Sequence, residues 1–188
     1  MLPVLEDPIL RAQVHSISVG EYHRMISAGS LPENVELIRG TLIEKMSQSP
    51  LHGSIVELLR EHVAAKVAAD CIVRQEKPLT FEESEPEPDV AVVRGVRSDF
   101  LTAHPSSAEL IIEVCVSSEA VDRVKLGVYA EAGIPEAWLI LAEERLVERH
   151  TEPQGTVYQR IERAALPSAL GSTVIAELSL PPTGLWPD

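Results

Sequence analysis

The sequence predicts a mixed α/β fold in which a central mixed β-sheet is flanked by helices, with an N-terminal helix and a β-hairpin ahead of it. Segments with the apolar period of amphipathic helices alternate with short β-branched runs. Range 109–116 is an almost continuous apolar run, typical of a strand buried on both faces. A helical segment separates it from a second such run at 136–141, which favours a right-handed βαβ crossover. With 188 residues, 45% of them hydrophobic, we expect one domain over 1–188.

The N-terminal part predicts a helix followed by a tight hairpin. Range 18–29 begins with a serine that has a glutamate three residues later, the pattern of a capped helix start, and it ends at a glycine. Range 35–44 holds two apolar runs that flank Arg39 and Gly40. Because glycine suits the positive φ of a two-residue turn, we expect a β-hairpin here.

A second helix and further strands are expected after the hairpin. Range 49–70 opens with a serine at the N-cap and a proline at the first helical position, and its apolar period predicts a helix ending near Asp70. The acidic loop 82–88 then delivers Asp89 to the start of a strand. A third helix is expected over 120–132. The remaining strands are expected at 71–75, 89–93, 145–149, 156–160 and 173–180.

Charge argues against simple binding of nucleic acid through a basic surface. The chain has 16 Lys and Arg against 29 Asp and Glu, a formal net charge of −13. Affinity for DNA rests largely on cations that neutralise phosphates. A role on DNA therefore needs a metal-filled acidic site, a small basic patch, or a homodimer or higher oligomer that gathers scattered cations in one cleft.

The cysteines and the apolar segments suggest a cytoplasmic protein. Cys71 and Cys115 lie in strand-like runs and lack the spacing of a metal or redox motif, so we expect buried, reduced thiols, with a disulfide between them as the alternative. No apolar run has the length needed to cross a bilayer, and the acidic N-terminus does not resemble a signal peptide.

Two acids and a lysine stand out as a candidate site. Glu113 interrupts the apolar run 109–116, where a carboxylate is costly unless a cation or hydrogen bonds accompany it. Asp89, at the start of a neighbouring strand, could face it, and two such carboxylates suit Mg²⁺ or Mn²⁺. Lys125 lies on the sheet-facing stripe of the helix 120–132, four residues before Tyr129, and could supply a cation to the same cavity.

These residues form an ordered set of motifs. Pro88 and Asp89, then Glu113 with Val114, then a nearby lysine, resemble the PD-(D/E)XK nuclease superfamily. The segments VELIRGTLIEKMSQSPLH, PEPDVAVV, LIIEVCVSS and KLGVYAEAGIPEAWLI resemble the bacterial restriction endonuclease family of the Uma-two type. The resemblance implies a restriction-endonuclease-like core and a Mg²⁺-dependent endonuclease that hydrolyses phosphodiester bonds, with DNA as the expected substrate.

The same resemblance implies roles for individual residues. Asp89 and Glu113 would bind Mg²⁺, Glu36 would complete the site, and Lys125 would orient or activate the attacking water. The usual lysine of the E-x-K step would fall at position 115, where this chain has a cysteine, so Lys125 on the next helix would take its place. A recurrent histidine of the family matches His52, which would contact a phosphate or Glu36 from the first turn of a helix.

Each residue also has an alternative explanation. Asp89 could serve only a turn, and Glu113 with Lys125 could form a buried structural ion pair in a non-catalytic binding or regulatory protein. Glu36 could face solvent, and His52 could cap or pack its helix. Tyr129 and Trp138 are expected in the core rather than in the site. The acids of the loop, Glu82, Glu83, Glu85 and Glu87, are expected to be solvated.

Overall fold

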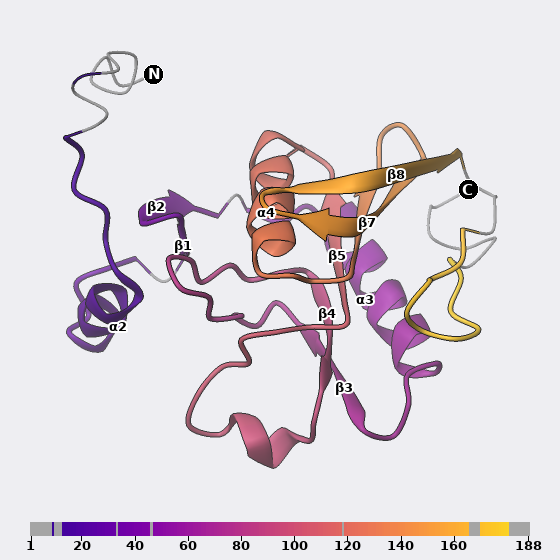
Figure 1. Cartoon of the computed structure of the whole chain (residues 1–188), viewed down its shortest axis with the longest axis horizontal. Helices are drawn as coiled ribbons and strands as arrows, with labels where there is room; N and C mark the ends of the chain where they lie inside the picture. The colour runs from indigo at the N-terminus through magenta and orange to yellow at the C-terminus, as the bar shows by residue number, and fades with distance from the viewer. Residues whose placement is uncertain are drawn as a thin grey trace.

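A six-stranded mixed sheet forms the centre of the computed structural model, which describes residues 9, 13–32, 34–45, 47–117, 119–165 and 170–180 (Figure 1). Its strands, in spatial order, are β3 (Cys71–Gln75), β4 (Val90–Arg94), β5 (Leu110–Cys115), β6 (Glu136–Leu141), β7 (Leu146–Gln154) and β8 (Val157–Ala165). The β5–β6 pair is parallel and its neighbours pair antiparallel, so the predicted mixed α/β fold is confirmed.

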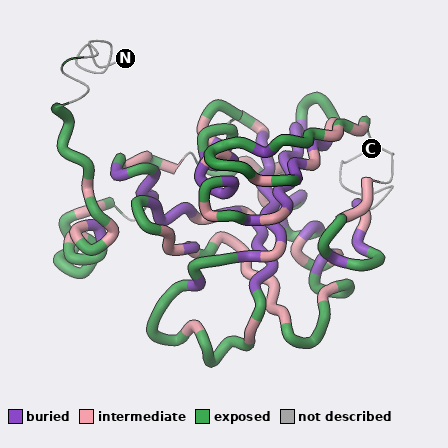
Figure 2. The backbone as a smooth tube through the Cα atoms, in the orientation of Figure 1, coloured by how far each residue is buried: buried purple, intermediate pink, exposed green. Residues whose placement is uncertain are grey.

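Two helices cover the two faces of this sheet. Helix α4 (Glu119–Glu131) connects the parallel strands β5 and β6, as predicted, and packs on one face. Helix α3 (Pro50–Ala64) packs on the other face. Because side chains alternate along a strand, Val114 lies in the core under α3, whereas Cys115 lies in the core under α4. Figure 2 shows the buried residues concentrated along the central strands.

The N-terminal elements form a separate layer beside the sheet. Strands β1 (Val35–Ile38) and β2 (Thr41–Glu44) make the predicted hairpin, with positive φ at both turn residues, Arg39 and Gly40. Helix α2 (Val19–Ser27) begins with the predicted capping box. The hydroxyl of Tyr22 donates to the carbonyl of Val35 over 2.9 Å, and this hydrogen bond joins the helix to the hairpin.

The acidic loop is partly buried, which corrects one expectation. Glu82 and Glu83 are exposed, but Glu85 is only 3% exposed. The backbone N–H of Glu85 donates to the carbonyl of Leu37, so the loop pairs with the hairpin. The carboxylate of Glu85 contacts His23 and Thr80. Those partners compensate the burial of the charge.

The strands predicted at 145–149 and 156–160 are the longer β7 and β8, and two further predictions were wrong. Helix α3 ends at Ala64 instead of near Asp70, because the chain turns over 65–70 so that Val67 packs against the core beneath the helix. Range 173–180 forms no strand; its one recorded pairing among the described residues is the isolated bridge between Gly171 and Ser179. Its apolar residues instead cover the α3 face of the sheet. None of the described helices combines the length and the apolar character that crossing a membrane requires.

Candidate functional site

A cavity of about 490 Å³ lies where β4 begins and β5 ends. The antiparallel register pairs Val90 with Ile112, so the preceding Asp89 comes opposite Glu113. The Asp89 carboxylate accepts from the backbone N–H of Val114 at 2.7 Å, and the Asp89 N–H donates to Oε2 of Glu113 at 3.3 Å. The structure therefore brings together the two acids that the sequence singled out.

Lys125 and Glu36 complete the buried floor of the cavity. Nζ of Lys125 lies 2.8 Å from Oε1 of Glu113 and 3.6 Å from Oε2 of Glu36. Glu36 does not face solvent, since the docked hairpin buries it and the N–H of Glu87 donates to its carboxylate. The side chains of Glu113, Glu36 and Lys125 are 1%, 4% and 6% exposed, respectively.

Acid exceeds base around Lys125, and the pKa values reflect this. Burial raises the pKa of Glu113 to about 8; Asp89 and Asp122 act in the same direction, while Lys125 opposes them. Burial alone would lower the pKa of Lys125, but Glu113, Glu36 and further carboxylates outweigh it and raise the pKa. The cluster is thus short of positive charge, which a proton or a bound cation could supply.

Tyr129 is part of this cluster as well as part of the core. It is fully buried, as expected, but its hydroxyl donates to Oε1 of Glu113. The four-residue spacing from Lys125 was the sequence signal for this contact, because it places both residues on one face of α4. Trp138, the other aromatic expected in the core, is fully buried and donates to Glu136.

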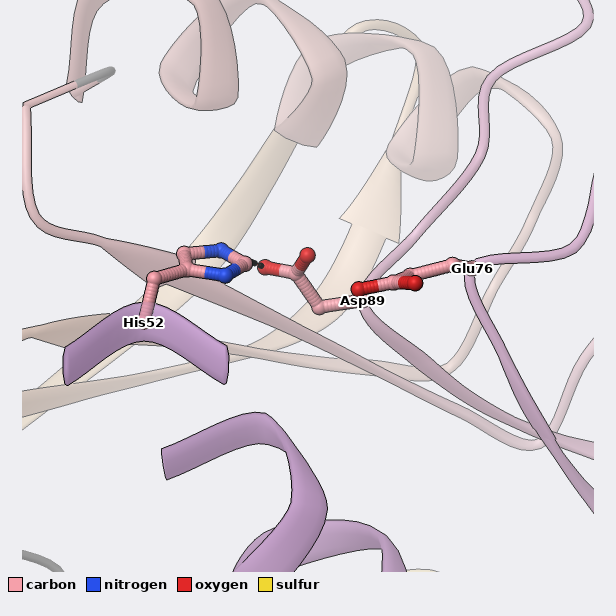
Figure 3. A group of neighbouring side chains, drawn as sticks. All are labelled: His52, Glu76 and Asp89. Atoms are coloured by element: carbon pink, nitrogen blue, oxygen red, sulfur yellow. Dashed lines mark hydrogen bonds and ion pairs between the residues drawn. The ribbon is translucent and has the colours of Figure 1, made fainter. Parts of the chain in front are cut away.

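A second group of side chains that could bind a metal lies on the side of Asp89 away from Glu113. Figure 3 shows His52 of α3 and Glu76 on either side of Asp89, and the ligand atoms of all three lie within 4.8 Å of one another. Nε2 of His52 lies 3.2 Å from Oδ2 of Asp89, so the carboxylate that it contacts is Asp89 and not Glu36. Burial acts to lower the pKa of His52, but Asp89 outweighs it and the pKa is raised.

The sequence analysis missed Glu76. This residue follows β3 with a positive φ of 48°, and its N–H donates to the carbonyls of Pro88 and Asp89. The register that pairs Gln75 with Val90 brings it beside Asp89. The only sequence signal was an acid directly after a predicted strand, and the pairing of that strand was not known.

Cys115 occupies the position of the usual superfamily lysine and has a different role. Its thiol donates to Oδ2 of Asp122 at 3.0 Å, and burial raises its pKa. It therefore stays uncharged, and Lys125 is the cation next to Glu113. Both cysteines are free thiols, as expected, but Cys71 is only partly buried, whereas Cys115 is buried.

The wall of the cavity is acidic with a few basic groups. Lys45, at its rim, pairs with the carboxylate of Glu87 at 2.7 Å. The carboxylates that line the cavity are those of Glu36, Glu44, Glu76, Glu87, Asp89, Glu113 and Asp122, while its lysines are Lys45 and Lys125. Carboxylate oxygens are suitable donors for Mg²⁺ or Mn²⁺, so the acids that line the cavity fit such a cation.

Comparison with known proteins agrees with the fold. A search of curated proteins found no match. A solved structure of a protein from Anabaena variabilis, described as a "putative nuclease belonging to DUF820", is similar with a TM-score of 0.69 at 20% sequence identity, over 87% of this chain and 94% of the other. This likeness shows that the two chains share a fold. Residues 19–185 match the Uma2 family model, described as "Putative restriction endonuclease", so the chain belongs to that family.

Proposed function

We propose that this member of the Uma2 family is a nuclease that uses Mg²⁺ or Mn²⁺ to hydrolyse phosphodiester bonds in DNA. The observation that carries the proposal is the position of Asp89. Its backbone binds Glu113 on one side, and its carboxylate meets His52 and Glu76 on the other, at the wall of one acidic cavity. Such a constellation suits metal-assisted phosphate chemistry.

Four side chains would hold the cation. Asp89 and Glu113 are the proposed ligands, with Glu76 and His52 as further donors from β3 and α3. When bound, the cation would lower the pKa of a water molecule and neutralise charge on the scissile phosphate.

The protein's own groups would orient the reactants. Lys125 contacts Glu113 and Glu36. It would orient the attacking water or stabilise negative charge that develops on the phosphate. Glu36 assists by keeping the amine in the cavity. Without a cation, Nε2 of His52 holds the Asp89 carboxylate through Oδ2.

DNA must approach a protein with a formal charge of −13. Lys45 at the rim offers one cation, and we propose that a homodimer or higher oligomer brings others to the same cleft. Binding through so few cations should depend only weakly on salt concentration.

The alternative is a binding or regulatory protein with an inactive site. The observation in its favour is the 2.8 Å contact of Glu113 with Lys125, because both side chains are buried and each could serve only to neutralise the other. Calorimetric titration with Mn²⁺ separates the two functions. A metal site predicts binding that is lost in Glu113→Gln, whereas a purely structural pair predicts no binding in either protein.

Cleavage of plasmid and single-stranded DNA in the presence of Mg²⁺ tests the proposal. Asp89→Ala should lower the rate at least about a hundredfold, because it removes the side chain shared by both donor groups. Asp70→Ala is the control, since Asp70 is an exposed acid that pairs with Arg94 outside the cavity. Equal rates in wild type and Asp89→Ala would exclude this assignment.

A further inference from the structure

The hydroxyl of Tyr129 is a buried polar group that the proposed chemistry leaves without a role. It donates to Glu113, one of the proposed ligands, from a fully buried position on α4. Packing alone would be met equally well by phenylalanine. We therefore looked for the role of the hydroxyl in its hydrogen bond to the carboxylate of Glu113.

The hydrogen bonds of Glu113 account for nearly all of its acceptor positions. Glu113 would be ionised when it binds a cation, and an ionised carboxylate offers about two lone pairs on each oxygen. Oε1 accepts from the amine of Lys125 and from the hydroxyl of Tyr129, and these two contacts saturate it. Oε2 accepts from the N–H of Asp89, which leaves one position on this oxygen. A cation can thus bind Glu113 through Oε2, on the side where Asp89 lies.

Of the two donors on Oε1, Tyr129 is the more firmly placed. The amine of Lys125 is shared, since it also lies 3.6 Å from Glu36 and 3.4 Å from the carbonyl of Glu87. The ring of Tyr129 is held by its helix and by the edge of Phe81, with 6.4 Å between the ring centroids. Without the hydroxyl, a shared amine would be the remaining donor to Oε1, and the carboxylate could rotate.

We propose that Tyr129 is a positioning residue that fixes the plane of the Glu113 carboxylate, so that Oε2 alone is presented to the divalent cation. This inference rests on the proposed function, because it assigns a role within the same metal site. It differs from a core role in a measurable way, since a core residue changes stability and leaves metal affinity unchanged.

Tyr129→Phe tests the inference, with Tyr158→Phe as a matched control. Tyr158 is also a buried tyrosine on the α4 side of the sheet, and its hydroxyl donates to the carbonyl of Ile134, outside the cavity. Titration with Mn²⁺ should show affinity weakened about 10- to 100-fold in Tyr129→Phe, as for other groups that orient a metal ligand. In Tyr158→Phe the affinity should stay within about twofold of wild type.

Kinetics supply a second readout. At limiting Mn²⁺, Tyr129→Phe should cleave DNA with a lower kcat and an unchanged KM for DNA, and excess Mn²⁺ should restore much of the rate. If Tyr129→Phe fails to fold, Phe81→Leu keeps the hydroxyl but loosens the ring, and its Mn²⁺ affinity should fall several-fold by the same reasoning.

The outcomes separate the two proposals. Binding of Mn²⁺ by wild type with equal affinity in Tyr129→Phe, or in Phe81→Leu where that variant is used, overturns the role of Tyr129 and leaves the proposed function intact. A wild-type protein that binds no Mn²⁺ overturns both. Selective loss of metal affinity in Tyr129→Phe supports both.

Discussion

The side chains of Glu113 and Glu148 are equally inaccessible to solvent but lie in opposite electrostatic surroundings. The side chain of each is 1% exposed. Glu148, on β7, accepts two hydrogen bonds from Arg123 at 3.0 and 3.1 Å and also contacts Arg163 and His150. Burial acts to raise its pKa, but Arg123 and the other partners lower it overall. Glu113 has Lys125 within a group of acids, and its pKa is raised.

The difference shows how a structural carboxylate can be distinguished from a candidate functional one. Burial disfavours the charge of both, so burial alone does not separate them. The Glu148 network is neutralised by its own side chains, whereas the cluster around Glu113 remains short of positive charge. An external cation would be redundant at Glu148 and stabilising at Glu113.

Removing the amine of Lys125 should have the largest effect. Lys125→Met leaves Glu113 and Glu36 buried without their cation, so the metal-free protein should lose about 3 kcal/mol in its free energy of unfolding. Urea denaturation measures this, and saturating Mn²⁺ should recover part of the loss. Lys45→Met, at the half-exposed rim, is the control with a loss below about 1 kcal/mol. A Lys125→Met protein as stable as wild type would contradict the charge deficit.

Glu148→Gln should have an intermediate effect that metal does not change. The substitution removes the negative charge and replaces one of the two oxygens that accept from Arg123 with an amide NH₂ group. We expect a loss of about 2 kcal/mol in the free energy of unfolding, moderated because the arginines are partly exposed. The same denaturation series with and without Mn²⁺ measures it. Recovery of stability by Mn²⁺ here would contradict the contrast between the two glutamates.

The pH dependence of stability should have opposite signs at the two glutamates. The pKa of Glu113 is raised to about 8 in the folded protein, above about 4.3 for an unfolded chain, so the folded state binds more protons between these values. The contribution of Glu113 to the free energy of unfolding is therefore lost as pH rises through this window, at up to about 1 kcal/mol per pH unit. Glu148, with a lowered pKa, loses its contribution as pH falls below the usual glutamate range. Metal-free denaturation across pH tests this, and Glu113→Gln should remove the first slope alone.

Most of the fold and the central residues of the site could be predicted because their signals are local. The capping box, the hairpin turn and the apolar run around Glu113 each specify structure within a few positions, and the motif spacing indicated Asp89 and Lys125. Glu76 and the partner of His52 depend on which segments pack together across the sheet end. No local pattern encodes that packing. The end of α3 was missed because a tertiary contact of Val67 overrides helix propensity.

Residue 87 serves the cavity mainly through its peptide groups. The N–H of Glu87 donates to Glu36, and its carbonyl accepts from Lys125, while its side chain reaches Lys45 at the rim. Since every amino acid except proline carries the same N–H and carbonyl, the contacts to Glu36 and Lys125 do not depend on which of these side chains stands at this position. A sequence motif defined by side chains would miss such a position. Residue 87 nevertheless connects the loop, the hairpin and α4 at the floor of the cavity.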